Sequence, residues 1–230
     1  MKKLIYSILL VLIGSVSFAQ NSNDAQVLLD RVNKKFAKVK DYQANAIIDT
    51  RISFLKIFPQ KAKVYFQQPD KFHVKSEGIA ILPKQNFGNL LNILTKEGTY
   101  LAIISGEETI AGSLTSIVNV IPQGDTSDLV LAKLWIDSSR DIILKSQLTT
   151  RTNGTILIEY THKNFVSYGL PDVIVFTIEV KKFKIPKAIS ADINSTAKKA
   201  PAKSDPKTGK IIISISDYII NKGLPAAVFK

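Results

Sequence analysis

The chain has 230 residues, of which 45% are hydrophobic and 22% are charged, and its formal net charge is +12. This composition is typical of a globular protein and excludes a disordered one, and the length allows one substantial core or two small ones. The chain contains no cysteine, which excludes disulfides, a thiolate nucleophile, a cysteine metal site and an acylated-cysteine membrane anchor.

The first nineteen residues have the pattern of a secretory signal peptide. Two lysines precede an apolar run over residues 4–13, and the segment ends in Ser17-Phe18-Ala19. Small residues at the −3 and −1 positions predict cleavage after Ala19, and the apolar run is too short to span a membrane comfortably. We therefore expect residues 1–19 to be removed and residues 20–230 to form a single soluble domain in the periplasm.

Export limits the anionic partners that the positive net charge could serve. The signal peptide holds two of the 31 basic residues and none of the 19 acidic ones, so cleavage lowers the net charge from +12 to +10. Outside the cytoplasm, a basic protein is better suited to anionic lipid or glycan than to nucleic acid. A basic surface that is only solvated is the simpler alternative.

Residues 23–40 have the periodicity of one amphipathic helix. Asn23, with Gln26 three residues later, resembles a capping box. The apolar positions recur at helical spacing; they are Val27, Leu28, Val32, Phe36 and Val39. We expect the basic face of this helix to be solvated; it comprises Arg31, Lys34, Lys35 and Lys38.

Period-two alternation then predicts a strand from Gln43 to Ile57, ended by Phe58-Pro59. Its more apolar side carries Ala44, Ala46, Ile48, Thr50 and Ile52.

The segment from Lys61 to Ser76 predicts a β-hairpin. Val64 and Phe66 alternate with polar residues in its first half, and Phe72 and Val74 do so in its second half. Residues directly opposite in an antiparallel pair share a face of the sheet, and here the apolar sets must coincide. We therefore expect Phe66 opposite Phe72 and Val64 opposite Val74.

This register predicts one apolar and one basic face. It leaves residues 68–70 as a three-residue loop and places Lys63 opposite Lys75, a like-charge pair that costs up to ~1 kcal/mol. The apolar face either packs a core or lines a cavity for an apolar ligand, and periodicity does not separate the two. The basic face is a candidate for contact with an anionic surface; its lysines are Lys61, Lys63, Lys71 and Lys75.

A second helix is predicted over residues 86–96. Its apolar residues stand at i, i+3, i+4 and i+7; they are Phe87, Leu90, Leu91 and Leu94. Such a stripe must dock on an apolar surface, and the nearest is the face of the hairpin that carries Phe66 and Phe72. The helix either covers that face permanently or acts as a movable lid.

The rest of the chain is predicted as short strands joined by tight turns. The expected strands span residues 99–105, 115–121, 129–137, 142–152, 155–162, 173–183 and 210–219. The turns are predicted at Gly106-Glu107, Ser138-Ser139, Asn153-Gly154 and Gly169-Leu170-Pro171. The fold class is mainly β with helices (α+β): one large curved antiparallel sheet or open barrel, with helices against one face.

Residues 184–210 have a different composition, rich in Lys, Ala, Ser and Pro, without periodicity. A segment of this kind buries too little surface to offset its ordering entropy, so we expect a flexible basic loop between the last two strands. Contact with a membrane surface or a partner is the sharper alternative.

The sequence offers few groups for catalysis. His73 and His162 are the only histidines, and neither has metal-ligand spacing. No phosphate-binding glycine loop, nucleophile elbow or HExxH motif is present. We therefore expect no enzymatic activity, cofactor or metal. Trp135, the only tryptophan, either packs in the core or at its rim, or offers a stacking surface to a ligand.

These features together resemble the periplasmic lipoprotein carriers and outer-membrane lipoprotein-sorting proteins, the LolA/LolB-like superfamily. The resemblance rests on the signal peptide, the helix that ends near VKDYQA, the YFQQPDKF element, and KLWIDSSRDIILKSQ followed by an Asn-Gly hairpin. It spans roughly residues 23–183. It implies a half-open antiparallel barrel whose concave apolar face, covered by helices, accepts the acyl chains of a lipoprotein in transit between two membranes.

The resemblance also assigns roles to individual residues. Pro69 and Phe72 match the family element, and Phe72 would line the cavity. The family's carriers have an arginine before this proline that holds the lid closed, whereas this chain has Gln68, which cannot supply the arginine's charged, forked donors. The candidate cavity residues are Ile48, Val64, Phe66, Gln68, Phe72, Val74, Phe87, Leu90, Leu91, Leu94 and Trp135.

Three functions are compatible with the sequence. The first is a monomeric periplasmic carrier of lipoproteins or related lipids, which would meet transport partners at the inner and outer membranes and no nucleic acid. The second is an envelope sensor or structural protein that uses the same sheet to bind a protein partner. The third, an enzyme on this fold, has the least support among the residues.

Overall fold

The computed structural model describes residues 22–52, 57–78, 82, 98–124, 128–152, 154–179 and 208–229. The predicted signal peptide, the predicted helix over residues 86–96 and most of the basic segment lie outside these residues.

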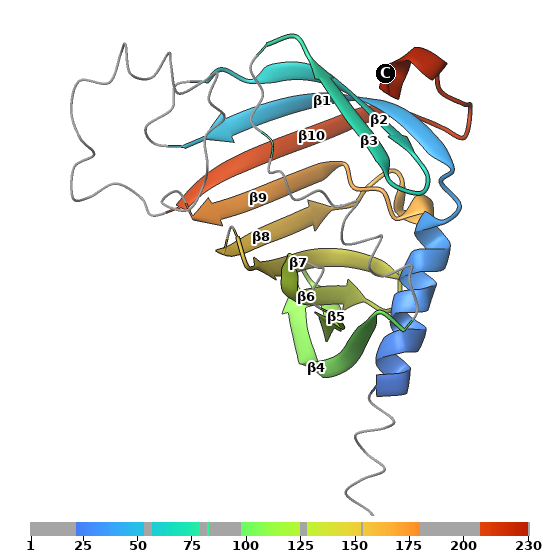
Figure 1. The fold of residues 1–230 in the computed structure, drawn as a ribbon, viewed down its shortest axis with the longest axis vertical. Coiled ribbons are helices and arrows are strands. Elements are labelled where there is room, and N and C mark those ends of the chain that lie inside the picture. The colour runs from blue at the N-terminus through green and yellow to red at the C-terminus, as the bar shows by residue number, and fades with distance from the viewer. Residues whose placement is uncertain are drawn as a thin grey trace, which may run out of the picture.

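The described residues form one ten-stranded antiparallel sheet, which is twisted and open at both ends (Figure 1). The strands are β1 (Asp41–Arg51), β2 (Gln60–Gln67), β3 (Lys71–Ser76), β4 (Tyr100–Ile110), β5 (Ser113–Pro122), β6 (Leu129–Asp137), β7 (Ile142–Thr150), β8 (Gly154–Thr161), β9 (Val173–Glu179) and β10 (Thr208–Ile220). Two short 3-10 helices, η1 (Val166–Tyr168) and η3 (Ala226–Phe229), follow β8 and β10. The predicted mainly β fold with a large antiparallel sheet is confirmed.

The order of strands in the sheet is β3-β2-β1-β10-β9-β8-β7-β6-β5-β4. Neighbours in the chain are neighbours in the sheet from β4 to β9, which makes this part an antiparallel meander. The last strand breaks this pattern, since β10 lies between β1 and β9 and pairs with both. The C-terminal strand therefore joins the N-terminal three strands to the meander and leaves β3 and β4 as the two edges.

The turn between β4 and β5 differs from the prediction. The strand continues through Gly106, where the pairing register shifts between Ile104 and Gly106, and the reversal occurs at Ala111-Gly112. Both turn residues have positive φ, 48° for Ala111 and 82° for Gly112. Gly106 therefore marks a bulge within a long strand and not its end, a use of glycine that a sequence pattern does not separate from a turn.

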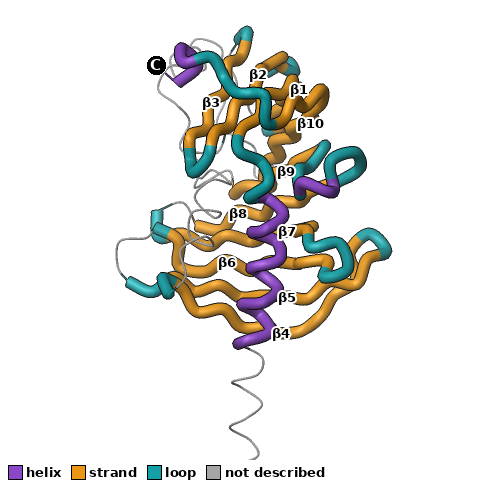
Figure 2. Tube along the Cα trace, turned by 90° about the vertical axis from the view of Figure 1, so that its right-hand side faces the viewer, coloured by secondary structure: helices purple, strands orange, loops and turns teal. Residues whose placement is uncertain are grey.

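One α-helix, over residues 22–36, is present in the described part of the chain and crosses one face of the sheet (Figure 2). Its buried side chains include Ala25, Leu28, Leu29 and Val32. Val27 was expected on this face, but it is 47% exposed. The reason is geometric, because Val27 is two residues from Ala25 and from Leu29, about 200° around the helix axis.

The face of the sheet that packs against this helix is called the inner face below, and the opposite one the outer face. The core is continuous between the helix and the inner face. Residues that the helix or the strands bury almost completely include Leu29, Ile48, Val118, Leu134, Ile136, Ile158 and Ile211. No helix among the described residues has the length and apolar character needed to cross a bilayer.

The connection from the helix to β1 is fixed by the end of β10. The helix stops four residues earlier than predicted, and residues 37 and 38 form a turn. The Asn221 side chain donates to the Lys38 carbonyl oxygen at 2.8 Å and accepts from the Lys40 backbone N–H at 2.7 Å. The C-terminal strand therefore positions the helix relative to the sheet.

Candidate functional site

The β2–β3 hairpin has the register predicted from its sequence. Phe66 lies opposite Phe72, Val64 opposite Val74, and the turn occupies residues 68–70. Val64 and Phe66 are 3% and 4% exposed, and Val74 is partly buried against the core. The apolar face of the hairpin is therefore part of the inner face of the sheet.

Phe72 differs from its neighbours on this face, because 41% of its surface is exposed. The residue is on β3, the edge strand, so no further strand of the sheet covers it from that side. Its partner Phe66 is 4% exposed and belongs to the core. An apolar surface therefore runs without a break from the buried core to solvent at this edge.

Aromatic side chains form the deeper part of this surface. The Phe66 ring lies 5.3 Å from Phe36 of the helix and 5.4 Å from Tyr42 of β1, measured between ring centroids. Tyr42 in turn lies 5.2 Å from Tyr218 of β10, which lies 4.8 Å from Phe165. These aromatic contacts form one cluster in which the helix, the hairpin and β10 pack against one another.

Gln68 was a candidate for the cavity, but the structure places it elsewhere. Its side chain is exposed, and Nε2 donates to the carbonyl oxygen of Ala37 at 3.1 Å. Its backbone N–H donates to the Lys40 carbonyl oxygen at 2.9 Å. Once the strand ends at Gln67, the two-residue alternation no longer applies, so Gln68 turns toward the end of the helix and away from the core.

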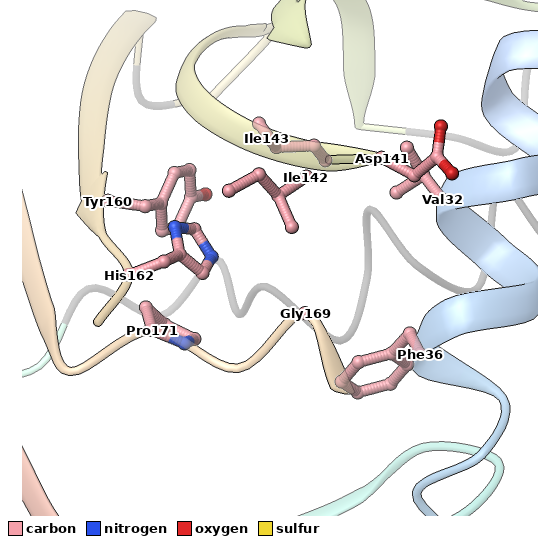
Figure 3. A pocket seen from close by; sticks show the side chains of 9 residues that line it. All are labelled: Val32, Phe36, Asp141, Ile142, Ile143, Tyr160, His162, Gly169 and Pro171. Carbon is pink, nitrogen blue, oxygen red and sulfur yellow. The ribbon is translucent and has the colours of Figure 1, made fainter. Parts of the chain in front are cut away.

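A second feature of the inner face is a pocket beside the helix. Figure 3 shows Val32 and Phe36 of the helix on one side of it and Tyr160 and His162 on the other. The remaining lining residues come from the β6–β7 turn, the start of β7 and the loop after η1; they are Asp141, Ile142, Ile143, Gly169 and Pro171.

His162 lines this pocket with a partly buried imidazole. Its Nδ1 atom is buried without a hydrogen-bond partner in the described part of the chain. Burial is the main cause that lowers the pKa of His162 to about 4, and the nearby charges of Arg140 and Lys35 lower it further. A hydrogen bond with the Gly169 backbone and the charge of Asp172 act in the opposite direction.

Polar contacts tie the helix to the β6–β7 turn at the rim of the pocket. Arg31 Nε lies 2.8 Å from Asp141 Oδ1, and the Lys35 ammonium donates to the Arg140 carbonyl oxygen. The predicted solvated basic face of the helix is therefore only partly solvated. Lys34 and Lys38 are exposed, whereas Arg31 and Lys35 contact the turn.

The turn itself is built around Asp137, which is 2% exposed. One carboxylate oxygen accepts hydrogen bonds from the Ser139 hydroxyl and backbone, and the other lies 2.7 Å from Arg140 Nε. Burial on its own would raise the pKa of Asp137, but the hydrogen bonds from Ser139 and Arg140 outweigh it and lower the pKa to about 2.

Trp135 lies on the outer face, because it alternates with the core residue Leu134 on β6. It is nevertheless 3% exposed. Its indole N–H donates to Glu108 Oε2 at 2.5 Å, and the ammonium groups of Lys133 and Lys145 lie 4.8 Å and 4.3 Å from the ring centroid. We therefore leave Trp135 out of the candidate cavity.

The other predicted residues divide into three groups. Ile48 is 1% exposed and lies in the core. The lysines expected on the basic face of the hairpin, Lys61, Lys63, Lys71 and Lys75, are all exposed. Phe87, Leu90, Leu91 and Leu94 lie outside the described residues.

Sequence reasoning missed the contribution of Tyr42, Tyr218, Tyr160 and His162 to the inner face. The alternation along each strand indicates which face these residues lie on. No sequence signal, however, placed β1, β8 and β10 in the same part of the sheet. No cluster of three potential metal ligands occurs among the described residues.

Comparison with solved structures identifies the fold. A DUF1329 family protein from Desulfovibrio piger matches with a TM-score of 0.57 at 11% identity, over 91% of this chain and 97% of that chain. A LolA superfamily protein from Nitrosomonas europaea matches with a TM-score of 0.56 at 13% identity, over 90% of this chain and 97% of that chain.

The chain has the fold of the LolA superfamily.

A third structure with the LolA-like fold is a domain from Vibrio parahaemolyticus designated an outer membrane lipoprotein-sorting protein domain. It matches with a TM-score of 0.56 at 11% identity, over 91% of this chain and 97% of that chain. No protein-family model and no curated protein matches the chain. The resemblance seen in the sequence is thus confirmed for the LolA-like fold, with one described helix against the sheet.

Proposed function

We propose that the protein is a periplasmic carrier that holds the acyl chains of lipoproteins or related lipids on its inner face and moves them towards the outer membrane. The observation that carries this proposal is the exposure of Phe72. An aromatic side chain that continues a hydrophobic core and is 41% exposed offers apolar surface that a ligand chain can cover. The LolA-like fold supports the same function.

The residues proposed to contact the acyl chain lie along the path from the edge to the core. Phe72 and Val74 form the mouth, and Phe66, Val64 and Phe36 form the deeper wall. All are apolar, so the gain on binding is burial of hydrocarbon, which is worth about 0.8 kcal/mol for each CH₂ group. Phe87, Leu90, Leu91 and Leu94, which lie outside the described residues, are further candidates for contact with the acyl chain.

The proposed location and chemistry follow from the sequence. The signal-peptide pattern over residues 1–19 supports export, and cleavage after Ala19 would release a soluble carrier. The function needs no covalent step, cofactor or metal, because a carrier only binds and releases its cargo.

The test is the substitution Phe72→Glu, with lipid that co-purifies from cells measured by mass spectrometry of organic extracts. A carboxylate at the mouth can be hydrated in the free protein but must lose water when hydrocarbon covers it, so lipid binding should fall while folding is retained. Leu101→Glu is the matched control, because Leu101 is 40% exposed on a strand whose opposite side holds the buried Ala102.

Three results would overturn the proposal. They are an unmodified protein that carries no lipid, a Phe72→Glu protein that keeps its lipid, and equal losses of lipid in the Phe72→Glu and Leu101→Glu proteins. If the Phe72→Glu protein is unfolded, Phe72 belongs to the closed core, and this result would argue against the carrier function. Circular dichroism and the melting temperature of each variant separate these cases.

A further inference from the structure

The outer face of the β2–β3 hairpin has a concentration of positive charge. Lys61 and Lys63 project from β2, and Lys71 and Lys75 project from β3, all exposed. Register places Lys63 directly opposite Lys75 and His73 opposite Tyr65. We call this set of four lysines the basic face.

Carboxylates near the basic face include those of Glu77 and of Asp217, which accepts a hydrogen bond from the Asn45 side chain at 3.0 Å. No ion pair joins any of the lysines of this face to a carboxylate within the described residues. On the β1 side, Lys63 faces the amide of Asn45 and Lys61 faces Ile47. Glu77 follows β3 at the Lys61 end, where its backbone N–H donates to the Lys61 carbonyl oxygen. Lys63 and Lys75 therefore form a like-charge pair in the sheet, with no acidic residue directly opposite either of them.

Apolar side chains accompany the basic face. Ile47, opposite Lys61, is 50% exposed. The 3-10 helix η3 packs beside β3, and the Lys71 ammonium lies 5.9 Å from the centre of the Phe229 ring. Cationic groups interspersed with partly exposed apolar groups suit a bilayer interface, where phosphates meet the cations and the outer hydrocarbon meets the apolar groups.

The basic face and the proposed cavity are the two sides of one strand. Phe72 points to the inner face, and its chain neighbours Lys71 and His73 point to the outer face. A membrane that contacts the basic face would therefore lie one sheet thickness from the mouth at Phe72. Figure 1 shows β2 and β3 at one end of the sheet.

From this arrangement we infer that the protein docks on anionic phospholipid bilayers through the outer face of the β2–β3 hairpin. The inference rests on the proposed function and adds to it the surface on which cargo is collected or delivered. Docking by four lysines is reversible, because each contributes only a modest electrostatic attraction that salt screens. Reversibility is what a shuttling carrier requires.

The test is cosedimentation with vesicles of phosphatidylcholine alone and of equimolar phosphatidylcholine and phosphatidylglycerol. The unmodified protein should bind only the anionic vesicles, and binding should weaken as ionic strength rises. Lys63→Gln/Lys75→Gln should lower the partition coefficient about 30-fold, which corresponds to about 1 kcal/mol for each lysine removed. Lys34→Gln/Lys163→Gln, which removes the same charge from two other exposed positions, is the control and should change it much less.

Several outcomes would overturn the inference. One is that the unmodified protein binds neither kind of vesicle. Another is that Lys63→Gln/Lys75→Gln binds as well as the unmodified protein. A third is that Lys34→Gln/Lys163→Gln loses as much binding as Lys63→Gln/Lys75→Gln. Binding to soluble polyglutamate through Lys63 and Lys75, with no binding to vesicles, would assign the face to an acidic protein partner instead.

Failure of this inference can be told apart from failure of the proposed function. Vesicle binding is measured with delipidated protein, whereas the carrier is tested by co-purified lipid in the Phe72→Glu protein. Cargo without vesicle binding overturns only the docking surface. Vesicle binding without co-purified lipid would support the docking surface and overturn the carrier function.

Discussion

The side-chain amide of Gln68, in the hairpin turn, donates a hydrogen bond to the backbone carbonyl oxygen of Ala37, just beyond the end of the helix. The contact supplies a partner to a backbone carbonyl where the helix ends, and it joins two elements 31 residues apart. In the family that the sequence resembles, an arginine at this position holds the lid. Here the residue is used to fix the helix to the hairpin.

Gln68→Ala should therefore lower stability modestly. Loss of one exposed hydrogen bond costs about 1 kcal/mol, which for a chain of this size lowers the melting temperature by about 2–4 °C. Gln67→Ala is the matched control, since Gln67 is the adjacent exposed amide on β2, and it should change the melting temperature little. Equal shifts in the two variants, measured by calorimetry, would show that the contact with Ala37 contributes nothing.

His162 should make stability depend on pH between about 4 and 6.5. Its pKa in the folded protein is lowered to about 4 from the ordinary 6.5, so the unfolded chain binds the proton more readily in this range. Stability is therefore fully present above pH 6.5 and falls as the pH drops through this window, by at most about 3 kcal/mol.

Urea unfolding at several pH values measures this effect. His162→Gln should flatten the curve between pH 4.5 and 6.5. A curve for His162→Gln that parallels the unmodified protein would mean that another group titrates. Because His162 lines the pocket beside the helix, the same substitution should alter the chemical shifts of Val32 and Phe36.

Two aspartates of the β6–β7 turn should differ strongly in their contribution to stability. Asp137→Ala removes a buried carboxylate that accepts from Ser139 and Arg140 and should cost about 3 kcal/mol. Asp141→Ala breaks an ion pair whose Arg31 and Asp141 side chains are 46% and 28% exposed, and should cost ~0–1 kcal/mol. Denaturant unfolding of both variants tests this order, and similar losses would contradict it.

Lys63 and Lys75, which lie opposite each other in the hairpin, should favour membrane contact and lower the free energy of unfolding. Lys75→Glu converts the pair with Lys63 from like to opposite charge and should stabilise the protein by a few tenths of a kcal/mol, up to ~1 kcal/mol. The same change should reduce binding to anionic vesicles. A melting temperature that stays the same or falls would show that repulsion between the two lysines is already relieved by solvent.

The sequence by itself determined the local geometry of the β2–β3 hairpin. Strict alternation in Val64, Phe66, Phe72 and Val74 left one register in which the apolar residues coincide, and the structure has that register. A hairpin between β7 and β8 is likewise present where the Asn-Gly pair predicted one, although Gly154 is already the first residue of β8 and pairs with Thr150. These features depend on residues close in the chain, where periodicity and turn chemistry suffice.

Alternation along a strand predicts which residues share a face of the sheet, but it does not predict what covers that face. Phe66 and Phe72 have equivalent sequence signals, yet one is 4% and the other 41% exposed, because β3 is the edge of the sheet. For the same reason the sequence left open whether Trp135 belongs to the cavity. The structure places it opposite the core, under the side chains of Lys133 and Lys145.

Only the tertiary structure decided which distant segments meet. The insertion of β10 between β1 and β9 brings Tyr218 to Tyr42, and the path of the helix brings Lys35 near His162. The contact between Gln68 and Ala37 arises in the same way. Each depends on the packing of elements far apart in the chain, and that packing is set by the summed burial of a whole core, which no local pattern of residues encodes.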